Sequence, residues 1–127
     1  MNRENLGRMP AHIRTIPQAM FDMDRWRTGD AFVPECESVG CVIGHCTILD
    51  PKPLPMWSNG IDFEVWSEQF TGMEAFSDDW NWCFAYNWAQ VDNTPEGAAR
   101  RIEWLLDKGL PEDWFEQMEG DSPLCYA

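Results

Sequence analysis

The segment SDDWNWCFAYNW, residues 77–88, most constrains the fold because it is the densest aromatic stretch of the chain. On a single helix its rings fall on two faces, one made of Trp80, Phe84 and Trp88 and the other of Trp82 and Tyr86. A helix that is apolar on two sides usually lies at the centre of a small core. The alternative is that one aromatic face meets a partner, since Trp and Tyr are enriched at binding hot spots.

Capping residues indicate where two helices begin and end. Ser77 is a suitable N-cap for the aromatic segment. In DNTPEGAARRIEWLLDKGLP, Thr94 is the expected N-cap, Pro95 fits the first helical position and Gly109 suits a left-handed stop. The expected buried stripe of this helix consists of Ala98, Ile102, Leu105 and Leu106. We interpret Arg100 and Arg101 as a helix face that balances neighbouring acids, and not as a phosphate site.

Hydrophobic spacing predicts further short helices over residues 3–16, 41–49, 61–72 and 111–118. Asn2 is the expected cap of the first, and Phe21, Met23 and Trp26 are expected buried anchors after it. These elements predict an all-α fold of five or six short helices, with at most a minor two-stranded β element. We expect a single compact domain over residues 1–127, with a loosely held tail at 119–127.

Charge is unevenly distributed along the 127 residues. The chain has nine basic and 22 acidic residues, a net charge of −13, and no Lys or Arg lies between Pro53 and Ala99. Such a composition disfavours nucleic acid and membrane surfaces and favours a basic partner. The alternative is that the acidity serves solubility alone.

Other bulk features indicate a cytoplasmic protein. No stretch of about 18 apolar residues is present to span a membrane. The N-terminal residues lack the apolar core of a secretory signal. Five cysteines at irregular spacing fit reduced thiols better than a disulfide framework.

The segment CESVGCVIGHC, residues 36–46, raises the question of metal or thiol chemistry. A zinc site would use Cys36, Cys41, His45 and Cys46. This spacing is not a usual zinc motif, and adjacent residues of a helix point about a hundred degrees apart. Cys41 and His45, one helical turn apart, have the outline of a thiolate and its base, but no third member is evident. The simplest interpretation is that the small cysteines allow close packing, so we expect no cofactor.

Other catalytic motifs are absent from the sequence. It contains no glycine-rich phosphate loop, no G-x-S-x-G, no H-E-x-x-H and no calcium loop. The adjacent acids Glu35/Glu37 and Asp78/Asp79 are interpreted as solvated surface. We therefore expect a protein that is not an enzyme.

Three short motifs stand out along the chain: Phe21-Asp22-Met23-x-x-Trp26, Cys36-x4-Cys41-x2-Gly44-His45 and Thr94-Pro95-x-x-Ala98-x-x-Arg101-Ile102. They resemble motifs of a group of small uncharacterised phage and prophage proteins. In that group the central motif has Gly-Thr where this chain has Glu37-Ser38. Trp can replace His at the position of His45, so the resemblance argues against metal binding. It implies a phage origin and no catalytic residue.

Together the charge map and the resemblance predict a phage-encoded, anti-CRISPR-like inhibitor that imitates nucleic acid in the host cytoplasm. Its expected partner is a host protein or ribonucleoprotein with a basic surface. The first acidic cluster comprises Asp62, Glu64, Glu68, Glu74, Asp78 and Asp79; the second comprises Glu112, Asp113 and Glu116; Trp57 and Trp66 are the expected apolar anchors. The alternatives are a zinc- or thiol-dependent enzyme or regulator, and a self-associating phage accessory protein.

Overall fold

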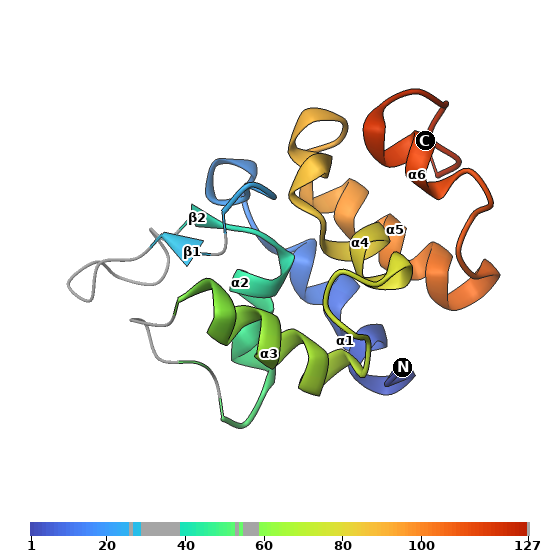
Figure 1. The fold of residues 1–127 in the computed structure, drawn as a ribbon. Helices are drawn as coiled ribbons and strands as arrows, with labels where there is room; N and C mark the ends of the chain where they lie inside the picture. Colours follow the sequence, from blue (N-terminus) through green and yellow to red (C-terminus); the bar gives the residue numbers. More distant parts are fainter. Residues whose placement is uncertain (26, 29–38, 53, 55–58, 127) are drawn as a thin grey trace.

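The structure, a computed structural model, describes residues 1–25, 27–28, 39–52, 54 and 59–126. Its α-helices are α1 (Arg3–Ile13), α2 (Val42–Cys46), α3 (Gly60–Thr71), α4 (Asp78–Phe84), α5 (Pro95–Lys108) and α6 (Trp114–Glu119). Short 3-10 helices are η1 (Gln18–Met20), η3 (Thr47–Leu49) and η4 (Tyr86–Gln90). Strands β1 (Arg27–Thr28) and β2 (Val39–Gly40) pair antiparallel, with Arg27 opposite Gly40. The predicted all-α class with a minor strand pair is confirmed (Figure 1).

The centre of the fold is the packing of α1 against α5, the most extensive contact between two elements. The buried residues that these helices contribute are Leu6, Met9 and Ile13 from α1, and Ala98, Ile102 and Leu105 from α5. Asn2 caps α1 as predicted, because its side chain accepts a hydrogen bond from the Asn5 N–H at 3.0 Å. Helix α1 ends at Ile13 and not at Ile16, and Pro10 lies inside it without interrupting it.

The aromatic segment packs against both α3 and α5, but it is not one helix. Helix α4 ends at Phe84 because Ala85 is extended, with φ −61° and ψ 140°, and the chain resumes as η4. The predicted continuous helix over residues 77–88 is therefore wrong, and so is the expected common face of Trp82 and Tyr86. Trp82 is fully buried, whereas Tyr86 is 67% exposed.

The three tryptophans of this segment satisfy their indole N–H groups inside the core. Trp80 Nε1 donates to Ser67 Oγ at 2.9 Å, Trp82 Nε1 to the Arg101 carbonyl oxygen at 2.9 Å, and Trp88 Nε1 to the Asn81 carbonyl oxygen at 3.2 Å. Buried polar groups usually have such partners. These bonds fix α4 against both α3 and α5.

The C-terminal region is built on a buried cation. Arg100 and Arg101 pair with Glu96 and Asp92, but Arg101 is fully buried, and its guanidinium lies 4.3 Å from the Trp88 ring centroid. The tail is anchored over this cation, because Arg101 Nη1 donates to the Tyr126 hydroxyl at 3.0 Å and Tyr126 is only 8% exposed. A second bond holds the tail to α6, since the Cys125 N–H donates to Gln117 Oε1 at 3.0 Å. The end of the tail is thus held by a buried cation and by Gln117, contacts that sequence periodicity did not reveal.

Across the described ranges, no helix combines the length and apolar character that crossing a membrane requires.

Candidate functional site

The first acidic cluster lies on α3, on the α3–α4 connection and on the first turn of α4. Asp62, Glu74 and Asp78 are exposed, and the remaining members are half-buried. Local capping places several of them. Asp62 closes a capping box with Asn59, with both hydrogen bonds at 3.0 Å. Ser77 caps α4, and Asp78 and Asp79 occupy its first turn.

Each described cation that forms an ion pair does so with an acid outside the two clusters. Arg14 lies 2.8 Å from Glu96 and 2.6 Å from Glu103, and Arg100 also pairs with Glu96. The two remaining ion pairs join Arg25 to Asp22 and Arg101 to Asp92. Within the described part of the chain, no predicted member of either acidic cluster forms an ion pair. Their negative charge is therefore not neutralised by those residues.

The second acidic cluster begins α6. Glu112, Asp113 and Glu116 are all exposed, as predicted for a surface. Asp113 has a structural role, because it accepts hydrogen bonds from Ser122 Oγ at 2.8 Å and from Gln117 Nε2 at 2.7 Å. These bonds hold the pKa of Asp113 below its ordinary value. In Figure 1 α3 lies in the lower part of the molecule and α6 at the upper right, so this cluster is separate from the acids on α3.

The predicted apolar anchors are not found on the described surface. Trp57 lies outside the described residues. Trp66 is only 4% exposed, stacks on Phe70 at 4.7 Å and donates its indole N–H to Asp50 Oδ2 at 3.0 Å. Trp66 is therefore a core residue, and its assignment as a surface anchor is wrong.

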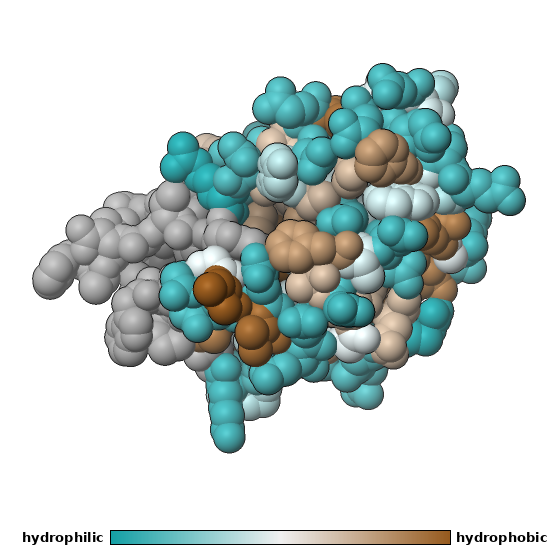
Figure 2. Space-filling model, viewed as in Figure 1, coloured by the Kyte–Doolittle hydropathy of each residue, from teal (hydrophilic) through white to brown (hydrophobic). Residues whose placement is uncertain are grey.

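Other apolar side chains are exposed near the first acidic cluster. Ile61 and Val65, one turn apart on α3, are 68% and 45% exposed. Figure 2 shows strongly apolar side chains on the surface in the region of α3. Phe76 and Tyr86 are 58% and 67% exposed. A helical-wheel reading could have found Ile61 and Val65, because they lie off the buried stripe of Phe63, Trp66 and Phe70.

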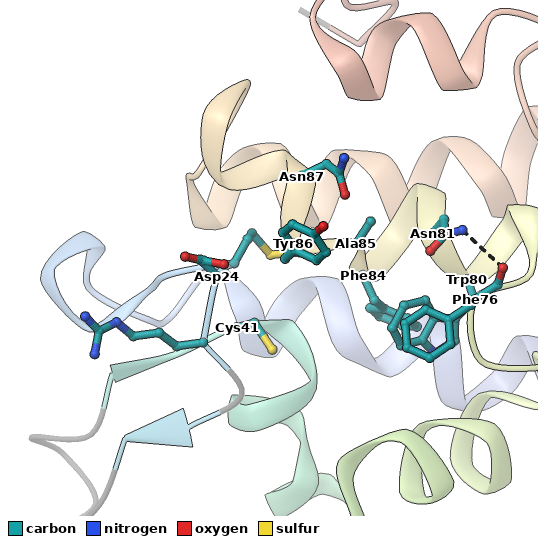
Figure 3. Close-up of a pocket in the computed structure, with 11 residues that line it drawn as sticks. Asp24, Cys41, Phe76, Trp80, Asn81, Phe84, Ala85, Tyr86 and Asn87 are labelled. Carbon is teal, nitrogen blue, oxygen red and sulfur yellow. Dashed lines mark hydrogen bonds between the residues drawn. The ribbon is translucent and has the colours of Figure 1, made fainter. Parts of the chain in front are cut away.

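An apolar pocket opens between the α4–η4 segment, the turn at residues 23–25 and the start of α2. We call it the aromatic pocket. Its volume is about 200 Å³. Its lining consists of Met23, Asp24, Arg25, Cys41, Phe76, Trp80, Asn81, Phe84, Ala85, Tyr86 and Asn87 (Figure 3). Sequence patterns give no sign of this pocket, because its walls come from segments that are separate in the chain.

Phe76 is held at this pocket in an unusual backbone conformation. Its φ of 65° lies in the left-handed region, which a bulky side chain rarely adopts. Asn81 Nδ2 donates to the Phe76 carbonyl oxygen at 3.1 Å, as the dashed line in Figure 3 marks. The Phe76 ring lies 4.8 Å from the Trp80 ring. Strain of this kind usually persists where the surrounding structure enforces it and is often found at functional sites.

The cysteine segment has a packing role in the described residues. Cys41 and Cys46 are buried, and burial raises the pKa of both thiols, that of Cys41 to about 11. A thiol with such a pKa is a poor nucleophile at neutral pH. His45 donates from Nε2 to the Met20 carbonyl oxygen at 2.6 Å.

Metal ligation receives no support from these positions. The described residues contain no group of three or more His, Cys, Asp or Glu side chains that could hold a metal ion. Cys36, the first ligand of the zinc hypothesis, lies outside the described residues, so the four-ligand set as a whole stays a prediction.

The candidate site must be interpreted from its own geometry. Comparison with protein-family models, with curated proteins and with solved structures finds no match for this chain.

Proposed function

We propose that the protein is a non-enzymatic inhibitor that covers a basic surface of another protein with its first acidic cluster. The observation that carries this proposal is the distribution of ion pairs. Arg14, Arg25, Arg100 and Arg101 pair with acids outside the cluster. The cluster is left as a surface of carboxylates that form no ion pair with any described residue.

Coulombic complementarity supplies the mechanism. Carboxylates on α3 and at the start of α4 take the places that phosphates would occupy against Lys and Arg side chains of the partner. Long-range attraction between opposite charges accelerates the encounter and makes it sensitive to salt. Exposed Ile61 and Val65 add apolar contact area beside the acids of α3.

The three motifs that resemble phage proteins support a phage origin and a host protein as the partner. The partner is then a host defence protein or ribonucleoprotein, and the site of action is the host cytoplasm. Blocking its basic surface would exclude the nucleic acid that the complex normally holds.

The test compares two charge-matched variants of the immobilised protein. The cluster variant carries Glu64→Gln, Glu74→Gln and Asp78→Asn. The control variant carries Glu4→Gln, Asp107→Asn and Asp121→Asn, three acids that form no ion pair among the described residues. Both lose the same net charge, so a difference between them reports where the charge lies.

Each protein is used to capture partners from a bacterial lysate at low salt, followed by elution with a salt gradient or with duplex DNA. We expect the captured partner to leave the cluster variant at lower salt than the control variant. We also expect DNA to displace it from the wild-type protein. Retention that is independent of salt, or equal for both variants, would contradict the proposal. Equal urea midpoints of the two variants would show that both are folded.

A further inference from the structure

We infer that the aromatic pocket receives one large apolar side chain from a basic segment of the partner. The basic character of the partner rests on the proposed function. The apolar anchor goes beyond it, since surface acids alone select no particular side chain.

The floor of the pocket is preformed and apolar. Met23, Cys41, Trp80, Phe84 and Ala85 line it, and each of them is at most 5% exposed. Trp80 is fixed by its bond to Ser67 at 2.9 Å. Apolar cavities of about 150 Å³ accommodate benzene, so the volume of about 200 Å³ is sufficient for a phenyl ring.

The rim of the pocket presents two exposed aromatic rings. Phe76 and Tyr86 are more than half exposed although they border an apolar cavity. Phe76 keeps its ring there at the expense of a left-handed backbone with φ 65°. Rings of this type are common in binding hot spots because they bury a large area with few rotatable bonds.

Negative charge around the pocket favours basic residues on either side of the apolar side chain that enters it. Asp24 lines the pocket and is exposed, and it lies away from Phe76 and Trp80 in Figure 3. On the other side, Glu74, Asp78 and Asp79 lie within two residues of Phe76 or Trp80 in the chain, and they form no ion pair among the described residues.

The cation in the lining is already neutralised, because Arg25 Nε lies 3.2 Å from Asp22 Oδ2. An occupant with Lys or Arg on both sides of its apolar residue would therefore have Asp24 of the lining on one side and, on the other, the acids that neighbour Phe76 and Trp80 in the chain.

The test uses three synthetic peptides built of Gly and charged residues. The first has a central Phe flanked by Lys, the second a central Ala flanked by Lys, and the third a central Phe flanked by Glu. Affinities for the complete protein are measured by calorimetry. Chemical shifts of the backbone amides of Cys41, Asn81 and Ala85 report where binding occurs. Burial of a phenylalanine ring should strengthen binding of the first peptide at least about tenfold over the second.

Matched variants separate the contribution of the apolar side chain to peptide affinity from the contribution of charge. We expect Phe76→Ala and Tyr86→Ala each to remove most of the difference between the Phe and Ala peptides. Phe115→Ala should preserve that difference, because Phe115 is a comparably exposed ring on α6, outside the pocket lining. The wild-type shift changes require no variant and would locate the peptide even if a substitution disturbed folding.

The outcomes distinguish the inference from the proposed function. If the two Lys peptides bind equally and salt weakens both, the acidic surface stands and the apolar anchor is overturned. If no Lys peptide binds at low salt, the preference for a basic partner is overturned as well. If the Phe peptides with Lys flanks and with Glu flanks bind equally, the pocket still binds an apolar side chain. The inference that the bound segment is basic is then overturned.

Discussion

The α1–α5 region and the α3–α4 region differ in how their charged side chains are paired. Along α1 and α5, Arg14 and Arg100 are paired with Glu96, and Arg101 is buried beneath the C-terminal tail. On α3 and at the start of α4, the acids have no ion-pair partner among the described residues. The first region uses charge to hold segments together, and the second leaves charge available for a partner.

Aromatic side chains follow the same division. Trp88 and Tyr126 enclose the Arg101 guanidinium and are nearly or fully buried. Phe76 and Tyr86 face solvent at the aromatic pocket. The same residue types thus stabilise the fold in one region and offer contact area in the other. Substitutions in either region test this difference.

The largest effect should follow from removing the buried cation. Arg101→Ala leaves a cavity beside Trp88 and removes the hydrogen bond to Tyr126, so we expect a loss of about 3 kcal/mol or more in unfolding free energy. Arg101→Met should lose less unfolding free energy, because the methionine side chain fills much of the cavity that alanine would leave. Urea denaturation measures both. Arg100→Ala is the exposed neighbour for comparison, and a similar midpoint for Arg101→Ala and Arg100→Ala would refute the role given to the buried cation.

The next effect concerns the tail. Tyr126→Phe removes the hydroxyl that accepts from Arg101 Nη1, and leaving a buried donor with one acceptor fewer should cost about 1–2 kcal/mol. Hydrogen exchange of the amides between residues 120 and 126 should accelerate. Tyr86→Phe is the matched control, because the Tyr86 hydroxyl makes no hydrogen bond with any described residue and the ring is exposed. Unchanged exchange in Tyr126→Phe would mean that the tail is held by other contacts.

A smaller effect tests the strained backbone at the pocket. Phe76→Gly and Phe76→Ala both remove the ring and its contact with Trp80, but only glycine adopts φ 65° without steric penalty. Phe76→Gly should therefore be more stable than Phe76→Ala by about 1 kcal/mol in urea denaturation. If the alanine variant is equally stable, the left-handed conformation carries no strain.

The smallest effect is the pH dependence of the paired region. Hydrogen bonds from Arg14 and Arg100 lower the pKa of Glu96 from its ordinary 4.5 to about 2. A lowered pKa in the folded state contributes stability above pH 4.5, and this contribution is lost as the pH falls toward 2. Because these side chains are largely exposed, Arg14→Gln should cost at most about 1 kcal/mol at neutral pH.

The difference in unfolding free energy between wild type and Arg14→Gln should shrink as the pH falls from 4.5 toward 2. Urea denaturation at stepped pH values measures it. Arg8→Gln is the control, because Arg8 donates to the Leu49 carbonyl oxygen and not to a carboxylate. A wild-type advantage over Arg14→Gln that stays constant from pH 5 to pH 2 would contradict the pairing.

Local signals in the sequence predicted much of the helical framework. Asn2, Ser77 and Thr94 cap helices as expected, and Gly109 ends α5 with a φ of 81°. Capping depends on hydrogen bonds within four residues, so the chain near each cap is sufficient to specify it. The break at Ala85 was missed, because it divides an aromatic pattern that is compatible with one continuous helix.

The candidate site was predicted only in part. Asp62, Glu74 and Asp78 are exposed as expected, because charged side chains are seldom buried without a partner. Trp66 could not be distinguished from a surface ring, since its burial depends on contacts with Phe70 and Asp50. The aromatic pocket was invisible for the same reason, because it exists only where residues 23–25, Cys41 and residues 76–87 come together.

The amino-acid sequence alone determined the helical class, most helix boundaries and the excess of negative charge, because these depend on neighbouring residues or on composition. Tertiary structure decided which arginine is buried, where the tail is attached and which aromatic rings face solvent. Arg101 shows the physical reason. A guanidinium is expected at the surface until Trp88 and Asp92, from the stretch before α5, and Tyr126, from the C-terminal tail, surround it.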